Sequence, residues 1–267
     1  MIDKFKLNML EYEFILGDTG NTNSTFTDEE KDIAHIIVTT IEQMYLQLEI
    51  KFPNVKIQIR KYPADSAAPM FCLAKNNPPA EVNFINIAID SLDYWCQAIF
   101  QLGHEMTHAA VYYNSPLNTK STPWIEETIS ESMSLFFLNL FADAWNTIEK
   151  FKNTPQYSTN VRTYLHNQLS KSGSGKLSMC RGYNELKQID TDSQTYREQR
   201  KNEMHKLYKL LNSENIKGLL LYRWYLQSDP LLLNTAKYRE AFPHNTAVSY
   251  LCDLQDSIFF QEDSEAY

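Results

Sequence analysis

The sequence predicts an α+β fold in which a small N-terminal sheet precedes a mostly helical remainder. Segments near residues 55–60 and 82–89 are rich in Val, Ile and Phe, as strands are. Apolar residues recur at helical spacing after residue 27, after residue 92 and from residue 193 onward. A chain of 267 residues is long enough to bury a large core, as one domain or as a core with an attached subdomain.

The composition argues against two classes of partner. The chain has 25 Lys and Arg against 33 Asp and Glu, a net charge of -8, so nothing suggests attraction to nucleic acid or to an anionic membrane. No run approaches the roughly 20 apolar residues that a bilayer-spanning helix needs. The first 20 residues are acidic and lack the apolar run of a signal peptide. We expect a soluble, cytoplasmic protein; export without a cleaved signal would leave the same features, and the oligomeric state stays open.

The cysteines suggest neither a thiolate zinc site nor a disulfide framework. They lie far apart and form no Cys-x-x-Cys pair; they are Cys72, Cys96, Cys180 and Cys252. We expect buried free thiols.

The N-terminal elements follow from capping and periodicity. Thr27-Asp28-Glu29-Glu30 is a capping box that opens a helix. The apolar residues of this helix lie three and four apart, as on one buried face. Val55 to Arg60 alternates with period two and predicts a strand, and the apolar run from Val82 to Ile89 predicts another.

A second helix, from about Leu92 to Tyr112, carries the motif His104-Glu105-Met106-Thr107-His108. Residues four apart lie on one helical face, so His104 and His108 can bind one Zn²⁺ while Glu105 lies beside the metal-bound water. The apolar stripe of the helix lies on the opposite side and consists of Trp95, Ile99, Met106 and Tyr113. We therefore expect one face in the core and the other at a cleft.

A long third helix follows a polar loop. Residues 114–122 predict the loop, and Thr122-Pro123 supplies an N-cap and a first-turn proline for a helix from Trp124 to about Phe151. Large apolar residues on more than one side of this helix predict that it is largely buried.

The third helix supplies the missing zinc ligand. Catalytic zinc takes three protein ligands and leaves a fourth position open. Glu127 and Glu131 share a helical side with large apolar residues, and a buried carboxylate is costly unless it is paired or metal-bound. We predict Glu127 as the third ligand and Glu131 as the acceptor for the free ring N–H of one histidine. Glu126, about 100° away, is expected on a solvated face.

The rest of the chain is predicted as a linker and a helical subdomain. Residues 154–192 are rich in Ser, Thr, Asn and Gln and predict a polar linker or loop region. Helices are expected from there on, near residues 193–211, 213–227, 231–241 and 246–259. The predicted domains are therefore 1–153, the linker 154–192, and 193–267.

These motifs carry a family resemblance. His104-Glu-x-x-His108, an eighteen-residue gap and Trp124-x-x-Glu127 together resemble the gluzincin zinc metallopeptidases, especially the aminopeptidase-N-like family and more distantly thermolysin. The resemblance covers residues 82–145. It implies a zincin fold, in which a small sheet has an edge strand along the substrate cleft above two metal-bearing helices. By position, Val82 to Ile89 matches that edge strand, and the C-terminal subdomain would complete the cleft.

Two segments depart from the family pattern. The family's Gly-x-Met-Glu-Asn segment is not found in residues 69–90, so aminopeptidase specificity is not implied. Asn215-Ile216-Lys217-Gly218 is similar to the family's Tyr-x-Lys-Gly helix start, with Asn215 in place of the catalytic tyrosine. The residues that remain as possible oxyanion donors are Tyr208, Tyr222, Tyr225 and His244.

The function expected from the sequence is a zinc metalloprotease with one Zn²⁺ per chain and a peptide or protein substrate. In this hydrolase, Glu105 would act as general base toward the metal-bound water. The alternative is a zinc-binding homologue without activity that acts as a partner-binding module. A di-iron helical protein is a third interpretation, because Glu105-x-x-His108 is half of that signature, but no second Glu-x-x-His occurs in the chain.

Overall fold

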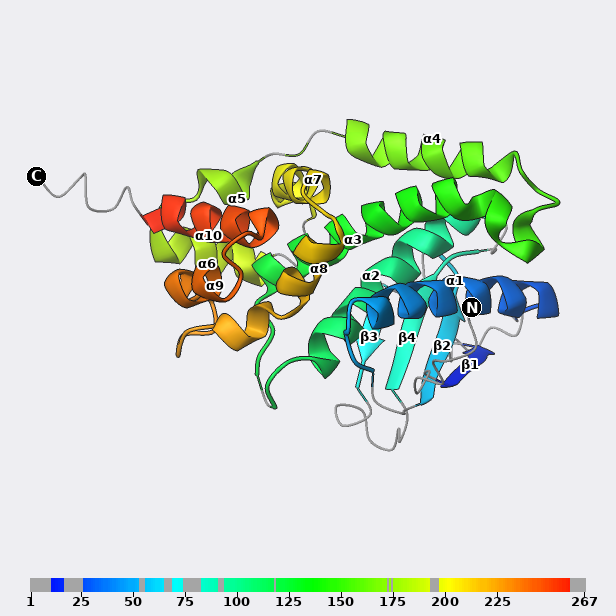
Figure 1. Ribbon diagram of the computed structural model, residues 1–267, viewed down its shortest axis with the longest axis horizontal. Helices are drawn as coiled ribbons and strands as arrows, with labels where there is room; N and C mark the ends of the chain where they lie inside the picture. Colours follow the sequence, from blue (N-terminus) through cyan, green and yellow to red (C-terminus); the bar gives the residue numbers. More distant parts are fainter. Residues whose placement is uncertain are drawn as a thin grey trace, which may run out of the picture. The chain divides into compact units, whose positions relative to one another are not determined.

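The computed structural model confirms the α+β class: the chain is mostly helical, with one small sheet (Figure 1). None of the described helices is long and apolar enough to cross a membrane. The residues that the structure describes are 11–16, 26–52, 56–64, 69–73, 83–90, 94–117, 119–171, 173, 175–192 and 197–259.

The chain divides into two compact units that differ from the predicted domains. One unit consists of Met1–Tyr113 and Phe137–Tyr164, and the other of Asn114–Phe136 and Leu165–Tyr267. The division therefore does not follow the predicted boundaries at residues 153 and 192. Helix α3 (Pro123–Ala144) contributes residues to both units, because 22 residues of helix extend over about 33 Å.

The sheet has four described strands in the order β1-β2-β4-β3 (Figure 1). Three of them run parallel, and the short β3 pairs antiparallel with β4. The strands are β1 (Glu11–Leu16), β2 (Lys56–Tyr62), β3 (Met70–Cys72) and β4 (Asn83–Ala88).

The edge-strand prediction for Val82 to Ile89 is wrong. Strand β4, which occupies this segment, lies between β2 and β3, and five of its six residues are buried. A strand covered on both faces is largely apolar, and four of the six residues of β4 are Phe, Ile or Ala. The edge beside β4 is formed by β3, and Val82 lies outside the described residues.

Helix α1 (Asp28–Gln47) begins at the predicted capping box. The hydroxyl of Thr27 accepts from the backbone N–H of Glu30, and the Glu30 carboxylate accepts from the backbone N–H of Thr27. The same carboxylate pairs with Lys61 of β2 at 2.6 Å. Helix α1 lies beside α2 (Trp95–Tyr113), and the hydroxyls of Tyr45 and Thr107 are 2.7 Å apart (Figure 1).

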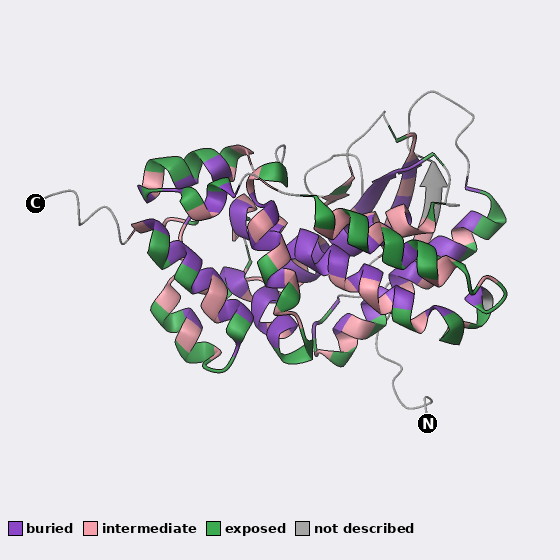
Figure 2. Ribbon diagram, turned by 90° about the horizontal axis from the view of Figure 1, so that it is seen from above, coloured by how far each residue is buried: buried purple, intermediate pink, exposed green. Residues whose placement is uncertain are grey.

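Helix α3 is buried on nearly all sides up to Leu138, as predicted, but ends at Ala144 (Figure 2). Residues up to Phe151 continue in two 3-10 turns, η2 (Trp145–Thr147) and η3 (Glu149–Phe151). The helix tolerates buried hydroxyls because they bond to carbonyls one turn back: Thr128 to Trp124, Ser132 to Thr128, and Ser134 to Ser130.

The segment 154–192, predicted as linker or loop, is largely helical. It contains α4 (Tyr157–Ser170), α5 (Lys176–Met179) and α6 (Gly182–Asp192). Helix α4 buries only Val161 and Leu165 and exposes most of its other side chains, so its sequence is polar and resembles that of a loop. Residues 172 and 174 lie outside the described part.

The C-terminal helices agree best with the prediction at their far end. Predicted helix 246–259 coincides with α10, whereas predicted helix 213–227 ends early and continues as a 3-10 turn. The elements are η4 (Arg197–Gln199), α7 (Lys201–Lys209), α8 (Ser213–Leu220), η5 (Tyr222–Tyr225), α9 (Thr235–Ala241) and α10 (Thr246–Phe259). Residues 193–196 and 260–267 lie outside the described part.

Candidate metal centre

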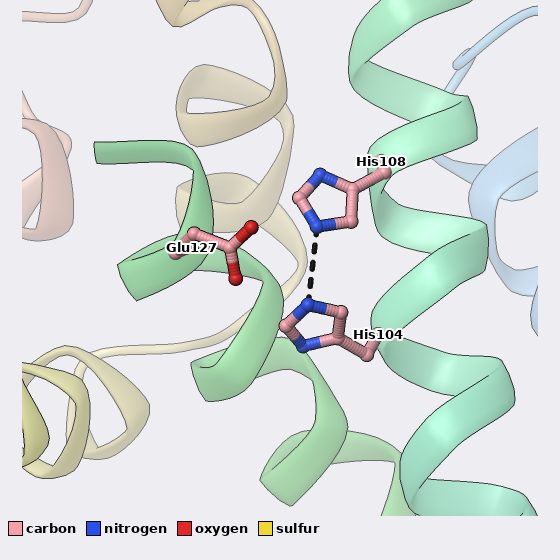
Figure 3. A group of neighbouring side chains, drawn as sticks. All are labelled: His104, His108 and Glu127. Atoms are coloured by element: carbon pink, nitrogen blue, oxygen red, sulfur yellow. Dashed lines mark hydrogen bonds between the residues drawn. The ribbon is translucent and has the colours of Figure 1, made fainter. Parts of the chain in front are cut away.

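The predicted ligands lie together. His104 and His108 of α2 and Glu127 of α3 each offer a ligand atom, and these atoms lie within 4.8 Å of one another (Figure 3). The Nε2 atoms of the two histidines are 3.1 Å apart. Two nitrogens bound to one tetrahedral zinc at about 2.0–2.1 Å lie about 3.3–3.4 Å apart, so the ring spacing already fits a shared ion. Among the described residues, no other group of three His, Cys, Asp or Glu is placed to hold a metal.

Helix α2 is fixed where it carries the histidines. The side-chain amide of Gln101 accepts from the backbone N–H of Ala88 and donates to the Ala88 carbonyl, which ties the helix to the end of β4. Gly103, one residue before His104, packs so closely that an added Cβ would lie 2.9 Å from Cδ2 of Phe137. These contacts fix the turn of α2 that carries His104 relative to the end of β4 and to the ring of Phe137.

Glu105 is buried, with 2 % of its surface exposed, and its charge reaches the edge of the sheet. Burial raises the pKa of the Cys72 thiol on β3, and the negative charge of Glu105 raises it further. Cys72 on β3, the strand at the described edge of the sheet beside β4, therefore lies within electrostatic reach of Glu105.

Helix α3 begins at Pro123, directly after Thr122, as predicted, and its first turn is also held by residues far along the chain. The Thr122 carbonyl accepts from the backbone N–H of Glu126 at 2.9 Å, and the Thr122 hydroxyl donates to the carbonyl of Pro230. Oδ1 of Asp190 on α6 accepts from the backbone N–H of Trp124 at 2.9 Å. The indole of Trp124 donates to the carbonyl of Leu231 at 3.0 Å. The turn that leads to Glu127 is therefore held by residues that follow it by more than sixty positions.

The prediction for Glu126 is wrong, because its side chain is buried and paired. Its Oε2 accepts from Nη2 of Arg223 at 2.5 Å and from the Tyr222 hydroxyl at 2.5 Å. Burial and the neighbouring charge of Glu126 raise the pKa of Tyr222, so the phenol keeps its proton and donates it. The guanidinium of Arg223 on η5 thus compensates the buried charge of Glu126, which was expected to be stabilised by solvent.

The structure does not place Glu131 as the predicted partner of a histidine ring. Its carboxylate pairs with Arg200, through Nη1 at 3.1 Å and Nη2 at 3.5 Å, and with Nε of Arg197 at 3.0 Å. Nη2 of Arg200 also lies 4.0 Å from Oε2 of Glu127. Sequence reasoning missed Arg200, since an arginine in the polar run Arg197-Glu-Gln-Arg200-Lys201 gives no signal that distinguishes it from a surface residue.

Two of the four candidate oxyanion donors, Tyr222 and Tyr225, make other contacts, and so does Asn215. Asn215 is buried and donates to the Leu210 carbonyl and the Thr246 hydroxyl, so it packs α8. Tyr222 donates to Glu126, and the ring of Tyr225 stacks on Tyr238. His244 is exposed before α10, whereas Tyr208 is half-buried on α7.

The donor set fits the metal that the sequence predicts. Two imidazoles and one carboxylate are the three-ligand set of many hydrolytic zinc sites, which keep a fourth position for water. Bound zinc would be held by Nε2 of His104, Nε2 of His108 and the carboxylate of Glu127. Comparisons with protein-family models, with curated proteins and with solved structures give no match. What this centre does must therefore be argued from its geometry.

Proposed function

We propose that this chain is a zinc metallopeptidase of gluzincin type, with one Zn²⁺ held by His104, His108 and Glu127. The observation that carries the proposal is the convergence of these three donors beside a buried glutamate at the second position of the His-Glu-x-x-His motif. A site that held zinc only for structure would have no need of a general base there.

The chain's own residues supply proton transfer and substrate placement. When bound, zinc lowers the pKa of its water to near 7 and polarises the scissile carbonyl. Glu105 would accept a proton from the attacking water on its carboxylate and pass it to the leaving amine. An extended peptide forms backbone hydrogen bonds along the edge strand β3. The charge of Glu105 contributes to the raised pKa of Cys72 on this strand, so the peptide lies near the general base.

The test is Glu105→Gln, which keeps the shape of the side chain and removes the base. The variant should bind zinc as the wild type does and should lose cleavage of a broad peptide library by at least about a hundredfold. Glu240→Gln makes the same change on an exposed face and should leave cleavage unchanged. Equal cleavage by the Glu105→Gln protein would refute the mechanism.

A second candidate is a zinc-binding protein without peptidase activity. The packing of Asn215, at the position of the family tyrosine, favours it, as do the bonded hydroxyl of Tyr222 and the stacked ring of Tyr225. The same library separates the two functions: zinc-dependent cleavage identifies the enzyme, and zinc binding without cleavage by the wild type identifies the binding module. Metal analysis also separates one zinc per chain from the two irons of a carboxylate-bridged centre.

A further inference from the structure

Arg200 lies within ion-pair distance of a predicted metal ligand, with its Nη2 4.0 Å from Oε2 of Glu127. It is fully buried, at 0 % exposure, and lies immediately before α7. A cation at that place opposes the partial positive charge of a helix N-terminus, and arginine gives the helix no side-chain cap. The stability of α7 therefore does not account for Arg200, whereas the two carboxylates on α3 do.

The contacts of Arg200 fix its position. The two Nη atoms reach both oxygens of Glu131, which is the forked geometry of a strong arginine–carboxylate pair. The Arg200 carbonyl accepts from the backbone N–H of Met204 at 2.9 Å, and the Met204 carbonyl accepts from the Ser132 hydroxyl at 3.0 Å. Helix α7 is thus bonded to α3 one residue beyond Glu131, and the guanidinium has little freedom to move.

The contact of Arg200 with Glu127 is of a different kind. At 4.0 Å, Nη2 attracts Oε2 of Glu127 without a hydrogen bond. The guanidinium can therefore orient the carboxylate without occupying the lone pairs that a metal needs. Glu127 and Glu131 are one helical turn apart, and Arg200 also offsets the repulsion between these like charges.

We propose that Arg200 is a positioning residue for the metal centre, which acts through Glu127 to hold its carboxylate in the orientation that binds zinc. This inference rests on the proposed zinc site. Partners that orient metal ligands typically contribute tenfold to a hundredfold to metal affinity. If Arg200 acted on the ion only as a nearby positive charge, its removal would tighten zinc binding, so the two roles predict opposite signs.

The experiment measures the zinc Kd by competition with a chromophoric chelator, and the thermal melting of the metal-free protein. Arg200→Lys keeps the charge and removes the planar fork. It should weaken zinc binding about tenfold or more. Arg223→Lys is the matched control, because Arg223 forms an equally buried pair with Glu126, the neighbour of Glu127. It should lower the melting temperature of the metal-free protein and leave the zinc Kd within about twofold.

A double-mutant cycle distinguishes positioning from a general structural effect. In a Glu127→Gln background, Arg200→Lys should change the zinc Kd little further, because the group through which it acts is gone. The same tenfold loss in both backgrounds would show that Arg200 does not act through Glu127. Tighter or unchanged zinc binding in Arg200→Lys itself would also overturn the inference.

If the Arg200→Lys protein does not fold, Glu131→Gln is the alternative variant for the same measurement of the zinc Kd. It leaves the guanidinium in place but removes the carboxylate that holds it, so Arg200 competes with the metal for Glu127 and zinc binding should weaken. An unchanged Kd would count against the inference. Failure of the zinc site itself is seen separately: a wild type that binds no zinc, or binds it equally well without Glu127, overturns both proposals.

Discussion

Three glutamates lie within six residues at the start of α3, and each is compensated in its own way. Glu126 is paired with Arg223 and Tyr222, and Glu131 with Arg197 and Arg200. Glu127, between them, faces the two histidines (Figure 3). The three neighbouring carboxylates therefore differ in the groups nearest to them, and Glu127 is the one grouped with two imidazoles that could hold a metal.

The Glu126–Arg223 pair gives a stability prediction. Both side chains are 6 % exposed, and Glu126→Gln leaves the guanidinium buried without its anion. We expect the free energy of unfolding to fall by about 3–5 kcal/mol. Replacing both residues together with leucine should cost much less than this, because no charge is then left uncompensated. Urea unfolding of the single and double variants measures the difference, and an equal loss in both would contradict this account.

The thiol of Cys72 reports on Glu105 independently of catalysis. The pKa of this thiol is raised above the ordinary 9.0 by burial and, secondly, by the charge of Glu105. Glu105→Gln removes only the second contribution, so the Cys72 pKa should fall and the thiolate fraction at a fixed pH near 8 should rise. Iodoacetamide labelling of Cys72, followed by mass spectrometry, should be faster in the variant. Equal labelling rates in the metal-free wild type and variant would show that the charge of Glu105 does not act on the Cys72 thiol.

At the scale of single residues, the sequence predicts which ligand side chains lie close together, but not which arginines pair with the glutamates of α3. Spacing within one helix places His104 four residues before His108, and helical phase turns Glu127 and Glu131 to one side. The partners of Glu126 and Glu131 come from Arg223 and Arg200, 97 and 69 positions further along the chain. No local pattern encodes contacts of that separation, and this is why the burial of Glu126 and the arginine partners of Glu131 were not predicted.

At the scale of secondary-structure elements, α2 and α3 approach closely at Gly103. Glycine costs about 1 kcal/mol in a helix interior, and here its absent side chain makes room for Phe137. Gly103→Val would place new carbon atoms inside contact distance of that ring. We expect a loss of about 1–3 kcal/mol in the free energy of unfolding, read from denaturant midpoints. Adding Phe137→Leu should recover part of it; no recovery would mean that the ring is not the obstacle.

Elements were predictable where one signal was strong. The capping box fixes the start of α1, and apolar periodicity gives α10 over its full predicted range. Strand β3 has three residues, too few for a pattern, and the edge role expected for the segment of β4 came from its position in the family resemblance. Helix α4 buries only a narrow stripe of side chains, so its sequence is mostly polar. Sequence patterns report burial of a segment, but not which neighbours cause it.

At the scale of the whole molecule, metal binding should be linked to folding. The ligands lie on two helices and converge only when both are folded, so zinc binds the native state in preference to the unfolded chain. At a free zinc concentration one hundred times the Kd, linkage adds about 2.7 kcal/mol of stability. For a chain of this size that corresponds to a rise of about 5–10 °C in Tm.

Thermal melting with and without a chelator measures this linkage. The zinc-dependent rise in Tm should be lost in His108→Ala and in Glu127→Gln, since each removes one of three ligands. His166→Ala, which removes an exposed histidine of α4, should keep the full rise. If zinc raised the Tm of the ligand variants as much as that of the wild type, the metal would be binding elsewhere, because stabilisation through this centre requires all three donors.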